Sequence, residues 1–187
     1  MPIVQRQSNW TIDSFLEWEA TKDLRFEFNG FEPVAMVGAK LGHNLIILNG
    51  VMALRRRLRR CSVFAETAKL RMAHSVRYPD LMVVCSAIDP NASEVTDPVV
   101  VMEVLSDGTS AQDRIVKNQE YRDTPSIQHY AILEQDRVAA TVFARAGSDW
   151  TGQLLVGRDA VLVFREIDVE IPLAEFYEGM EIEASTP

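Results

Sequence analysis

Residues 77–84, Arg77-Tyr78-Pro79-Asp80-Leu81-Met82-Val83-Val84, carry the clearest fold signal in this chain. Because Pro79 cannot donate to a neighbouring strand, it suits a strand's first residue and places Asp80 at or near the start of the apolar run 81–87. A second apolar run, 98–105, carries Glu103 near its end. Both runs are rich in valine, as expected of strands buried on both faces. If the two strands pair antiparallel, both carboxylates lie at one edge of the sheet.

Glu103 is difficult to place at a surface because apolar residues flank it on both sides. A buried carboxylate is costly unless it is paired or bound to a metal. Downstream, Asp113, Lys117 and Tyr121 share one face of a predicted helix over 111–122, at spacings of four. The Asp113–Lys117 pair alone has a plainer explanation, since an exposed pair at this spacing is ordinary helix decoration worth about 0.3–0.5 kcal/mol.

Two carboxylates and a lysine at the ends of neighbouring elements suit a divalent metal ion beside a polarised water. Hard oxygen ligands favour Mg²⁺ or Mn²⁺. The ammonium group of Lys117 can stabilise an attacking hydroxide or a phosphate charge. Asp80, Glu103 and Lys117 together therefore indicate metal-dependent phosphodiester chemistry, without indicating a substrate.

The length of 187 residues fits one domain, which we place over 1–187, with residues 1–9 expected to be frayed. The apolar runs are too short to span a bilayer and no secretory signal is visible, so a cytoplasmic protein is expected. Cys61 and Cys85 each lie in apolar, strand-like sequence, which favours buried free thiols in a reducing compartment. A zinc site is disfavoured because the chain has no closely spaced Cys or His pair.

The net charge of −8 counts against a nucleic-acid surface built on bulk charge, although it does not exclude a local basic patch. One candidate is the run of arginines within 55–60, with Lys69 and Arg71 further along. Cations at the end of a helix also suit the helix dipole, and this explanation of the run is the favoured one.

The remaining pattern is mixed. A helix should follow a Thr11 cap, a hairpin should span 24–37, and a long helix should span 41–58, with Leu41, Leu45, Leu48 and Met52 on one stripe. Further strands are predicted at 62–65, 68–72, 128–133, 137–145, 150–156 and 161–164, a loop at 89–97, and a short helix after Pro172. Helices alternating with strands indicate an α/β fold, or α+β with a mixed sheet.

The order of these motifs resembles the Uma2 family, a branch of the PD-(D/E)xK restriction-endonuclease-like superfamily, from about Phe26 to about Ile182. Residues 77–84 resemble the family's PD strand, and residues 98–106 resemble its glutamate strand, which ends in Glu-Val-Leu-Ser. Asp113, Lys117, Tyr121 and Tyr130 match the following helix and strand. Residues 26–30 resemble an early hairpin of the family, and His43 resembles the histidine that opens its long helix.

The resemblance implies a restriction-endonuclease-like core, with a central mixed β-sheet flanked by helices, and a DNA endonuclease that uses Mg²⁺ (or Mn²⁺). Asp80 and Glu103 would be metal ligands. Lys117 would orient or activate the water, because Leu105 stands where the wider superfamily has its lysine. Supporting residues would be Glu27, His43, Asp113 and Tyr121.

Cutting both strands of a duplex would suit a homodimer, and residues 61–65 are a candidate exposed edge strand for pairing. Two other functions stay open. A catalytically silent member of the fold could bind nucleic acid or protein. A metal-dependent hydrolase of small nucleotides would suit the acidic charge better, since such substrates need no extended basic groove.

Overall fold

The computed structural model describes residues 9–36, 38–105 and 111–182, the first three residues of the last range by their backbone only. The elements are α1 (Ile12–Glu19), β1 (Phe26–Phe28), β2 (Pro33–Ala35), α2 (Leu41–Arg57), β3 (Ser62–Ala65), β4 (Lys69–Arg71), β5 (Val76–Arg77), β6 (Leu81–Val84), β7 (Glu94–Val95), β8 (Val100–Val104), α3 (Ala111–Asp123), β9 (His129–Leu133), β10 (Ala139–Ala146), β11 (Asp149–Val156), β12 (Val161–Phe164), a 3₁₀ turn (Arg165–Ile167), β13 (Val169–Pro172) and α4 (Leu173–Phe176). This mixture of helices with mixed sheets confirms the predicted α+β class.

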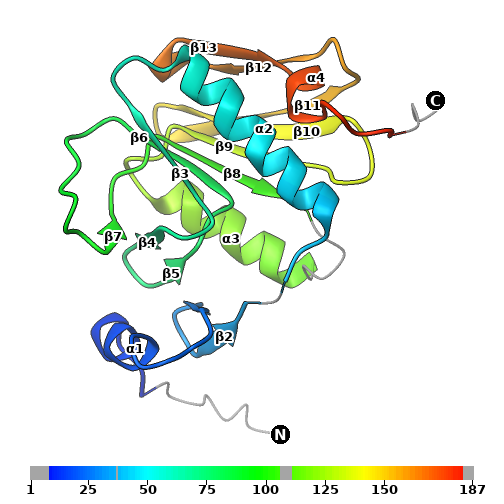
Figure 1. Cartoon of the computed structure of the whole chain (residues 1–187). Coiled ribbons are helices and arrows are strands. Elements are labelled where there is room, and N and C mark those ends of the chain that lie inside the picture. The colour runs from blue at the N-terminus through cyan, green and yellow to red at the C-terminus, as the bar shows by residue number, and fades with distance from the viewer. Residues whose placement is uncertain (1–8, 37, 106–110, 183–187) are drawn as a thin grey trace, which may run out of the picture.

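The central sheet has six strands in the order β11-β10-β9-β8-β6-β3 (Figure 1). Only β8 and β9 run parallel; the other neighbours are antiparallel. Helix α3 connects the parallel pair, as a crossover requires. Strands β6 and β8 pair antiparallel, with Leu81 opposite Met102, which confirms the arrangement expected for the two apolar runs.

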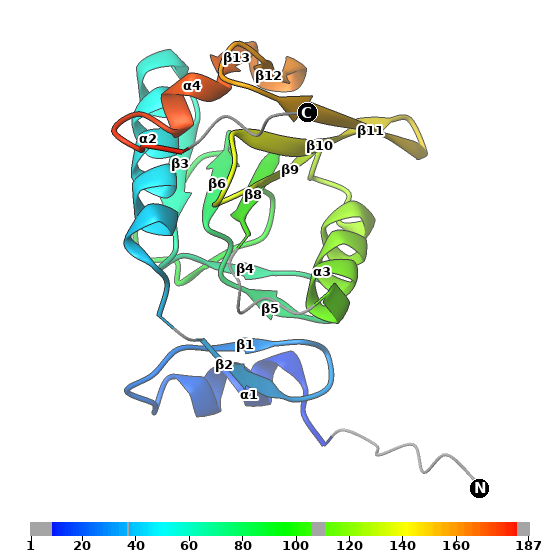
Figure 2. The ribbon, with the colours of Figure 1, turned by 90° about the vertical axis from the view of Figure 1, so that its right-hand side faces the viewer.

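Helices α2 and α3 cover opposite faces of this sheet (Figure 2). Side chains alternate between the faces along each strand. Val100 and Met102 pack on the α2 side with Ile46. Val101 packs on the other side with Tyr121 of α3. Strands β6 and β8 are therefore buried on both faces, as their unbroken apolar sequences predict.

A second sheet, in the order β2-β1-β5-β4-β7, lies beside the central one and carries α1 on its outer side (Figure 2). The predicted cap is confirmed, because the Thr11 side chain accepts a hydrogen bond from the Ser14 amide and Ser14 reciprocates. Strands β1 and β2 form the predicted hairpin. Phe15 of α1 stacks on Phe28 of β1 with ring centroids 5.3 Å apart, which holds the helix to the sheet.

Helix α2 has almost the predicted length, but the face that it buries is not the one that carries the apolar stripe. The apolar stripe is exposed: Leu41, Leu45, Leu48 and Met52. The buried residues of α2 are His43, Ile46, Ile47, Gly50, Ala53 and Leu54. Small residues explain the choice of face, because a Cβ on Gly50 would lie 2.8 Å from Leu81 and 3.0 Å from Phe176. Only a small-residue face lets α2 approach the sheet and α4 this closely.

The prediction of free thiols is wrong, because Cys61 and Cys85 form a disulfide bond. The two residues flank β3 and β6, whose pairing places Ser62 opposite Val84. The next pair outward is Cys61 and Cys85, with Cα atoms 4.1 Å apart. Nor are the cysteines fully buried: Cys61 is half-buried and Cys85 is exposed. Antiparallel register therefore brings together two residues that are 24 positions apart.

Strands β5 and β13 were not predicted, and β7 interrupts the predicted loop over 89–97. The expected fraying of residues 1–9 concerns mostly residues 1–8, which lie outside the described part of the chain. Over the described ranges, no helix combines the length and the apolar character needed to cross a bilayer.

Candidate functional site

Asp80 and Glu103 come together at one edge of the central sheet. Asp80 precedes the first residue of β6, while Glu103 is the penultimate residue of β8. Continuing the register of Leu81 opposite Met102 by one residue places the two carboxylates opposite each other. Asp80 is fixed there because its Oδ2 accepts a 2.7 Å hydrogen bond from the Val104 amide.

Glu103 points toward α3. Its Oε1 accepts a 2.6 Å hydrogen bond from the Tyr121 hydroxyl and lies 3.6 Å from Lys117 Nζ. Its side chain is only 13% exposed. Burial raises the pKa of Glu103 to about 8; the charge of Lys117 opposes this rise, whereas Asp80 and Glu27 add to it. A cation bound at this edge would favour the ionised form of Glu103, as a nearby positive charge does for any carboxylate.

Glu27 connects three elements around this edge. It is buried on β1 rather than solvated as a hairpin residue usually is. Lys117 Nζ lies 3.0 Å from its Oε1, Arg77 Nη1 donates to its Oε2 over 3.0 Å, and the Tyr78 amide donates to its Oε1. Glu27 therefore positions the lysine next to Glu103.

Arg77, which the motif analysis did not single out, is 1% exposed and forms the base of this network. Besides Glu27, it binds both carboxylate oxygens of Glu120 on α3, at 2.7 and 3.0 Å. A paired fork of this kind is the strongest geometry that an arginine–carboxylate contact adopts. It fastens α3, and with it Lys117 and Tyr121, to the strand that leads into Asp80.

On the α2 side, His43 is buried and its Nε2 lies 3.3 Å from Asp80 Oδ2. Burial disfavours the charged imidazole, yet the hydrogen bond and charge of Asp80, with Glu66 and Glu103, raise the pKa of His43. Glu66 follows β3 in the left-handed backbone region, at φ 47°, and its amide donates to the Asp80 carbonyl over 3.2 Å. Ligand atoms of His43, Glu66 and Asp80 all lie within 4.8 Å of one another.

The structure thus gathers six of the seven residues singled out from the sequence: Glu27, His43, Asp80, Glu103, Lys117 and Tyr121. The side chain of Asp113 lies outside the described part of the chain. Sequence reasoning missed Arg77, Glu120 and Glu66. Arg77 did have a signal in the sequence, because a charged residue next to a buried strand needs an opposite charge near it. Glu66 had none, because nothing local links residue 66 to residue 80.

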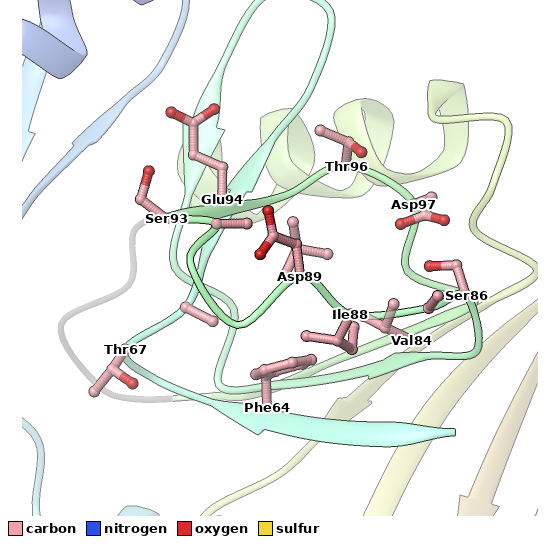
Figure 3. Close-up of a pocket in the computed structure, with 14 residues that line it drawn as sticks. Phe64, Thr67, Val84, Ser86, Ile88, Asp89, Ser93, Glu94, Thr96 and Asp97 are labelled. Carbon is pink, nitrogen blue, oxygen red and sulfur yellow. The ribbon is translucent and has the colours of Figure 1, made fainter. Parts of the chain in front are cut away.

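Two cavities lie away from this edge. One, of about 450 Å³, lies between the 85–97 segment and β3, with Phe64 and Val84 on its floor and Asp89 and Thr96 above it (Figure 3). The other, of about 620 Å³, is lined by His129 and Glu166, whose side chains contact each other. None of the gathered site residues lines either cavity. The acidic edge is therefore distinct from both.

The architecture is that of a nuclease-like fold. A solved structure described as "a putative nuclease belonging to DUF820" from Anabaena variabilis superposes with a TM-score of 0.74 over 89% of this chain and 97% of that one, at 15% identity. At this identity the likeness concerns the fold alone.

The sequence comparisons define the family. The family model Uma2, described as "Putative restriction endonuclease", matches residues 12–174, and the chain belongs to this family. It is similar to two uncharacterized proteins of Synechocystis sp. Protein sll1609 is 27% identical over 88% of this chain and 97% of its own length. Protein slr1290 is 26% identical over 74% of this chain and 76% of its own.

Proposed function

We propose that this protein is a Mg²⁺-dependent endonuclease that hydrolyses phosphodiester bonds in DNA. The observation that carries the proposal is the meeting of Asp80 and Glu103 at one sheet edge, with Lys117 Nζ 3.6 Å from Glu103. Family membership supports the same reaction class. Asp80 and Glu103 are assigned as metal ligands and Lys117 as the group that orients or activates the attacking water.

The charge balance of the site fits a divalent ion. Burial keeps the pKa of Glu103 raised even though Lys117 is near, and a bound divalent ion would lower it and favour the carboxylate that ligates metal. Oxygen donors are the ligands that Mg²⁺ and Mn²⁺ prefer. A metal ion held by Asp80 and Glu103 would polarise a phosphate oxygen and lower the pKa of a bound water.

Lys117 can act on the same phosphate. Its ammonium is held by Glu27 on one side and reaches the Glu103 carboxylate on the other. From there it can donate a hydrogen bond to a water or to a phosphate oxygen beside Glu103, where negative charge develops during hydrolysis. Tyr121 supports this arrangement by donating to Glu103 and fixing the orientation of its carboxylate.

A contact surface for DNA lies just beyond the C-terminal end of α2, where Arg59 and Arg60 are exposed. Arg57, the last residue of α2, lies fourteen residues after His43, about 21 Å along the helix axis. Lys69 and Arg71, in contrast, pair with Glu19, Asp13 and Glu94, so they contribute less free charge. Phosphate contacts at the arginine end would position a duplex across the acidic edge.

A cleavage assay tests the proposal. Supercoiled plasmid, linear duplex and single-stranded DNA are incubated with Mg²⁺ or Mn²⁺ and the wild type, Glu103→Gln or Lys117→Met. We expect either substitution to lower the cleavage rate at least about a hundredfold, the size of effect expected when a transition-state stabiliser is removed. The matched control is Glu32→Gln, an exposed glutamate on the β1–β2 hairpin, which should cleave like the wild type.

Unchanged cleavage by Glu103→Gln would reject the assignment. A wild type that binds DNA without cutting it would identify a silent binding module. Hydrolysis of dinucleotides but not of DNA would identify a small-nucleotide hydrolase, the reading that the net charge of −8 suits. We also propose that the protein is cytoplasmic. Reductants in that compartment would act on the Cys61–Cys85 bond.

We also propose a homodimer, formed through the exposed stripe of α2 (Leu41, Leu45, Leu48 and Met52). The adjacent strand β3 is an edge of the central sheet, as predicted. Antiparallel packing of two α2 helices would bring Arg55 and Arg56 of one copy near the α2 N-terminus of its partner. At that end the arginines would meet two exposed carboxylates, Glu178 and Glu181. These flank Met180, which lies against Gly42 at the start of α2.

Light scattering after gel filtration tests the dimer. We expect the mass of two chains for the wild type and of one chain for Leu45→Glu. Leu24→Glu, at a position that is 64% exposed and off the stripe, should leave the mass unchanged. A monomeric wild type at micromolar concentration would reject the proposal.

A further inference from the structure

We propose that His43, Glu66 and Asp80 form a second cation position, separate from the Asp80–Glu103 pair and selective for a first-row transition metal ion over Mg²⁺. It deepens the proposed metal-dependent function by giving the same site a second ion. Neither the motif order nor the family match assigns Glu66 any role.

The distances fit one ion. One ligand atom from each of the three residues lies within 4.8 Å of the other two, and His43 Nε2 is 3.3 Å from Asp80 Oδ2. Two ligands on opposite sides of an ion are separated by twice the bond length, about 4.2–5 Å for bonds of about 2.1–2.5 Å. The observed separations do not exceed this limit, so the three side chains are close enough together to share one ion.

The imidazole of His43 is suited to be a ligand. Its side chain is 7% exposed, and its Nε2 lies 3.3 Å from Asp80 Oδ2, so Nε2 is the ring atom that would coordinate the ion. With a carboxylate oxygen of Glu66 also within 4.8 Å of a ring nitrogen, this buried imidazole has the surroundings of a metal ligand.

Glu66 is attached to the site by its backbone. Its amide donates to the Asp80 carbonyl, and β3 pairs with β6 immediately before it. The carboxylate is half-buried rather than freely solvated. Residue 66 is thus carried to Asp80 by the sheet register, and its side chain extends the acidic edge on the α2 side.

Glu103 serves a different position because it lies on the opposite face of the sheet. Its neighbour two residues back, Val101, packs on the α3 side with Tyr121, and Glu103 itself contacts Tyr121 and Lys117. Among the described residues, Glu103 does not belong to the group within 4.8 Å of His43. Asp80, between the two faces, is the ligand that both positions would share.

The donor set decides the selectivity. Mg²⁺ binds through oxygen ligands and keeps several waters, whereas imidazole nitrogen favours transition metals such as Mn²⁺, Co²⁺ and Zn²⁺. One nitrogen and two carboxylates therefore bind those ions more tightly than Mg²⁺. The Asp80–Glu103 pair offers oxygen alone and is the position that Mg²⁺ would fill.

Mn²⁺ is the probe for the test, which uses no DNA. Calorimetric titration of the full chain should give two Mn²⁺ ions bound by the wild type, and pulsed EPR should detect ¹⁴N coupling from His43. Glu66→Gln and His43→Gln should each weaken one site at least tenfold and leave the other within threefold. Glu103→Gln should keep the ¹⁴N coupling and lose the other site; Asp80→Asn should lose both.

Matched controls are Glu32→Gln and His74→Gln, an exposed glutamate and an exposed histidine outside the site, which should bind like the wild type. A single Mn²⁺ in the wild type, absent ¹⁴N coupling, or two intact sites in Glu66→Gln would each overturn the second position. The test measures only the binding of the metal. A protein that binds two ions but fails to cut DNA would therefore still confirm the second position, and a nuclease that binds one ion would refute the second position but not the proposed function.

Discussion

Lys117 Nζ lies closer to Glu27, at 3.0 Å, than to Glu103, at 3.6 Å. The lysine is therefore held mainly by a residue of the N-terminal hairpin, on a different sheet from the carboxylate that it is proposed to assist. Hairpin, α3 and central sheet meet at this one ammonium group. Changes in the hairpin should therefore be felt both in stability and at the site.

Glu27→Ala should destabilise the protein by about 3 kcal/mol, because it removes one partner from an almost fully buried arginine. Arg77 would keep Glu120 but lose the Glu27 contact, and the Tyr78 amide would lose its acceptor. Urea unfolding followed by circular dichroism measures the change. Glu32→Ala, on the same hairpin but exposed, should stay within about 0.5 kcal/mol of the wild type. Equal values for the two variants would show that the network contributes nothing.

Glu103→Gln should stabilise the metal-free protein at alkaline pH. The pKa of Glu103 is raised in the folded protein to about 8 from 4.5, so folding favours its protonated form. That contribution is complete below pH 4.5 and is lost as the pH rises through 8. Glutamine cannot ionise, so at pH 9 the melting temperature of the Glu103→Gln variant should exceed that of the wild type by about 3–8 °C. At pH 4.5 the two should melt together, and a difference independent of pH would contradict the argument.

Glu19 should make the attachment of α1 sensitive to acid. Burial opposes its charge, but Lys69 and Tyr78 outweigh burial and lower the pKa of Glu19 below 4.5. A lowered pKa gives stability that is present above pH 4.5 and is lost as the pH falls through the folded value. Trp18 belongs to this helix and contacts Trp10, so fluorescence in a Trp150→Phe background should report its release below pH 4.5. Glu19→Gln should remove most of this pH dependence; an unchanged profile would assign it elsewhere.

Reduction of the Cys61–Cys85 bond should lower stability by about 3.4 kcal/mol, the loop-closure value for a bond across 24 positions. For a protein of this size that is about 7–14 °C in melting temperature. Differential scanning calorimetry with and without dithiothreitol measures the effect. A Cys61→Ser, Cys85→Ser double variant should melt like the reduced protein and ignore the reductant. Two free thiols by mass spectrometry in the untreated protein would refute the bond.

Much of this fold follows from local pattern. The runs around Asp80 and Glu103 are long and apolar enough to predict buried strands, and Thr11 and Pro172 mark helix starts. The short strands β5, β7 and β13 could not be predicted in this way. With two to four residues each, they exist because neighbouring strands pair with them rather than through their own periodicity.

Some residues of the site can likewise be predicted from local sequence, and others cannot. Glu103 stands out because a charge in an apolar run demands compensation, Asp80 because Pro79 marks the start of a strand, and Lys117 because it shares a helix face with Asp113 and Tyr121. Glu66 and the Cys61–Cys85 bond depend on the pairing of β3 with β6, which no local feature specifies. The exposed stripe on α2 misleads for a related reason: apolar residues occupy both faces of that helix, and only the close approach at Gly50 decides which one is buried.

Asp80 also ties two strands together, because its Oδ2 accepts the Val104 amide where β6 and β8 meet. A descendant that had lost every trace of catalysis would still need this aspartate to keep its sheet intact. Retention of the residue in a homologue is consequently a poor marker of activity. Among the described residues, the Glu66 side chain accepts no backbone amide of this kind, so it is free to change once selection on chemistry ceases. Among related genomes, position 66 is the one that should separate active enzymes from inactive ones.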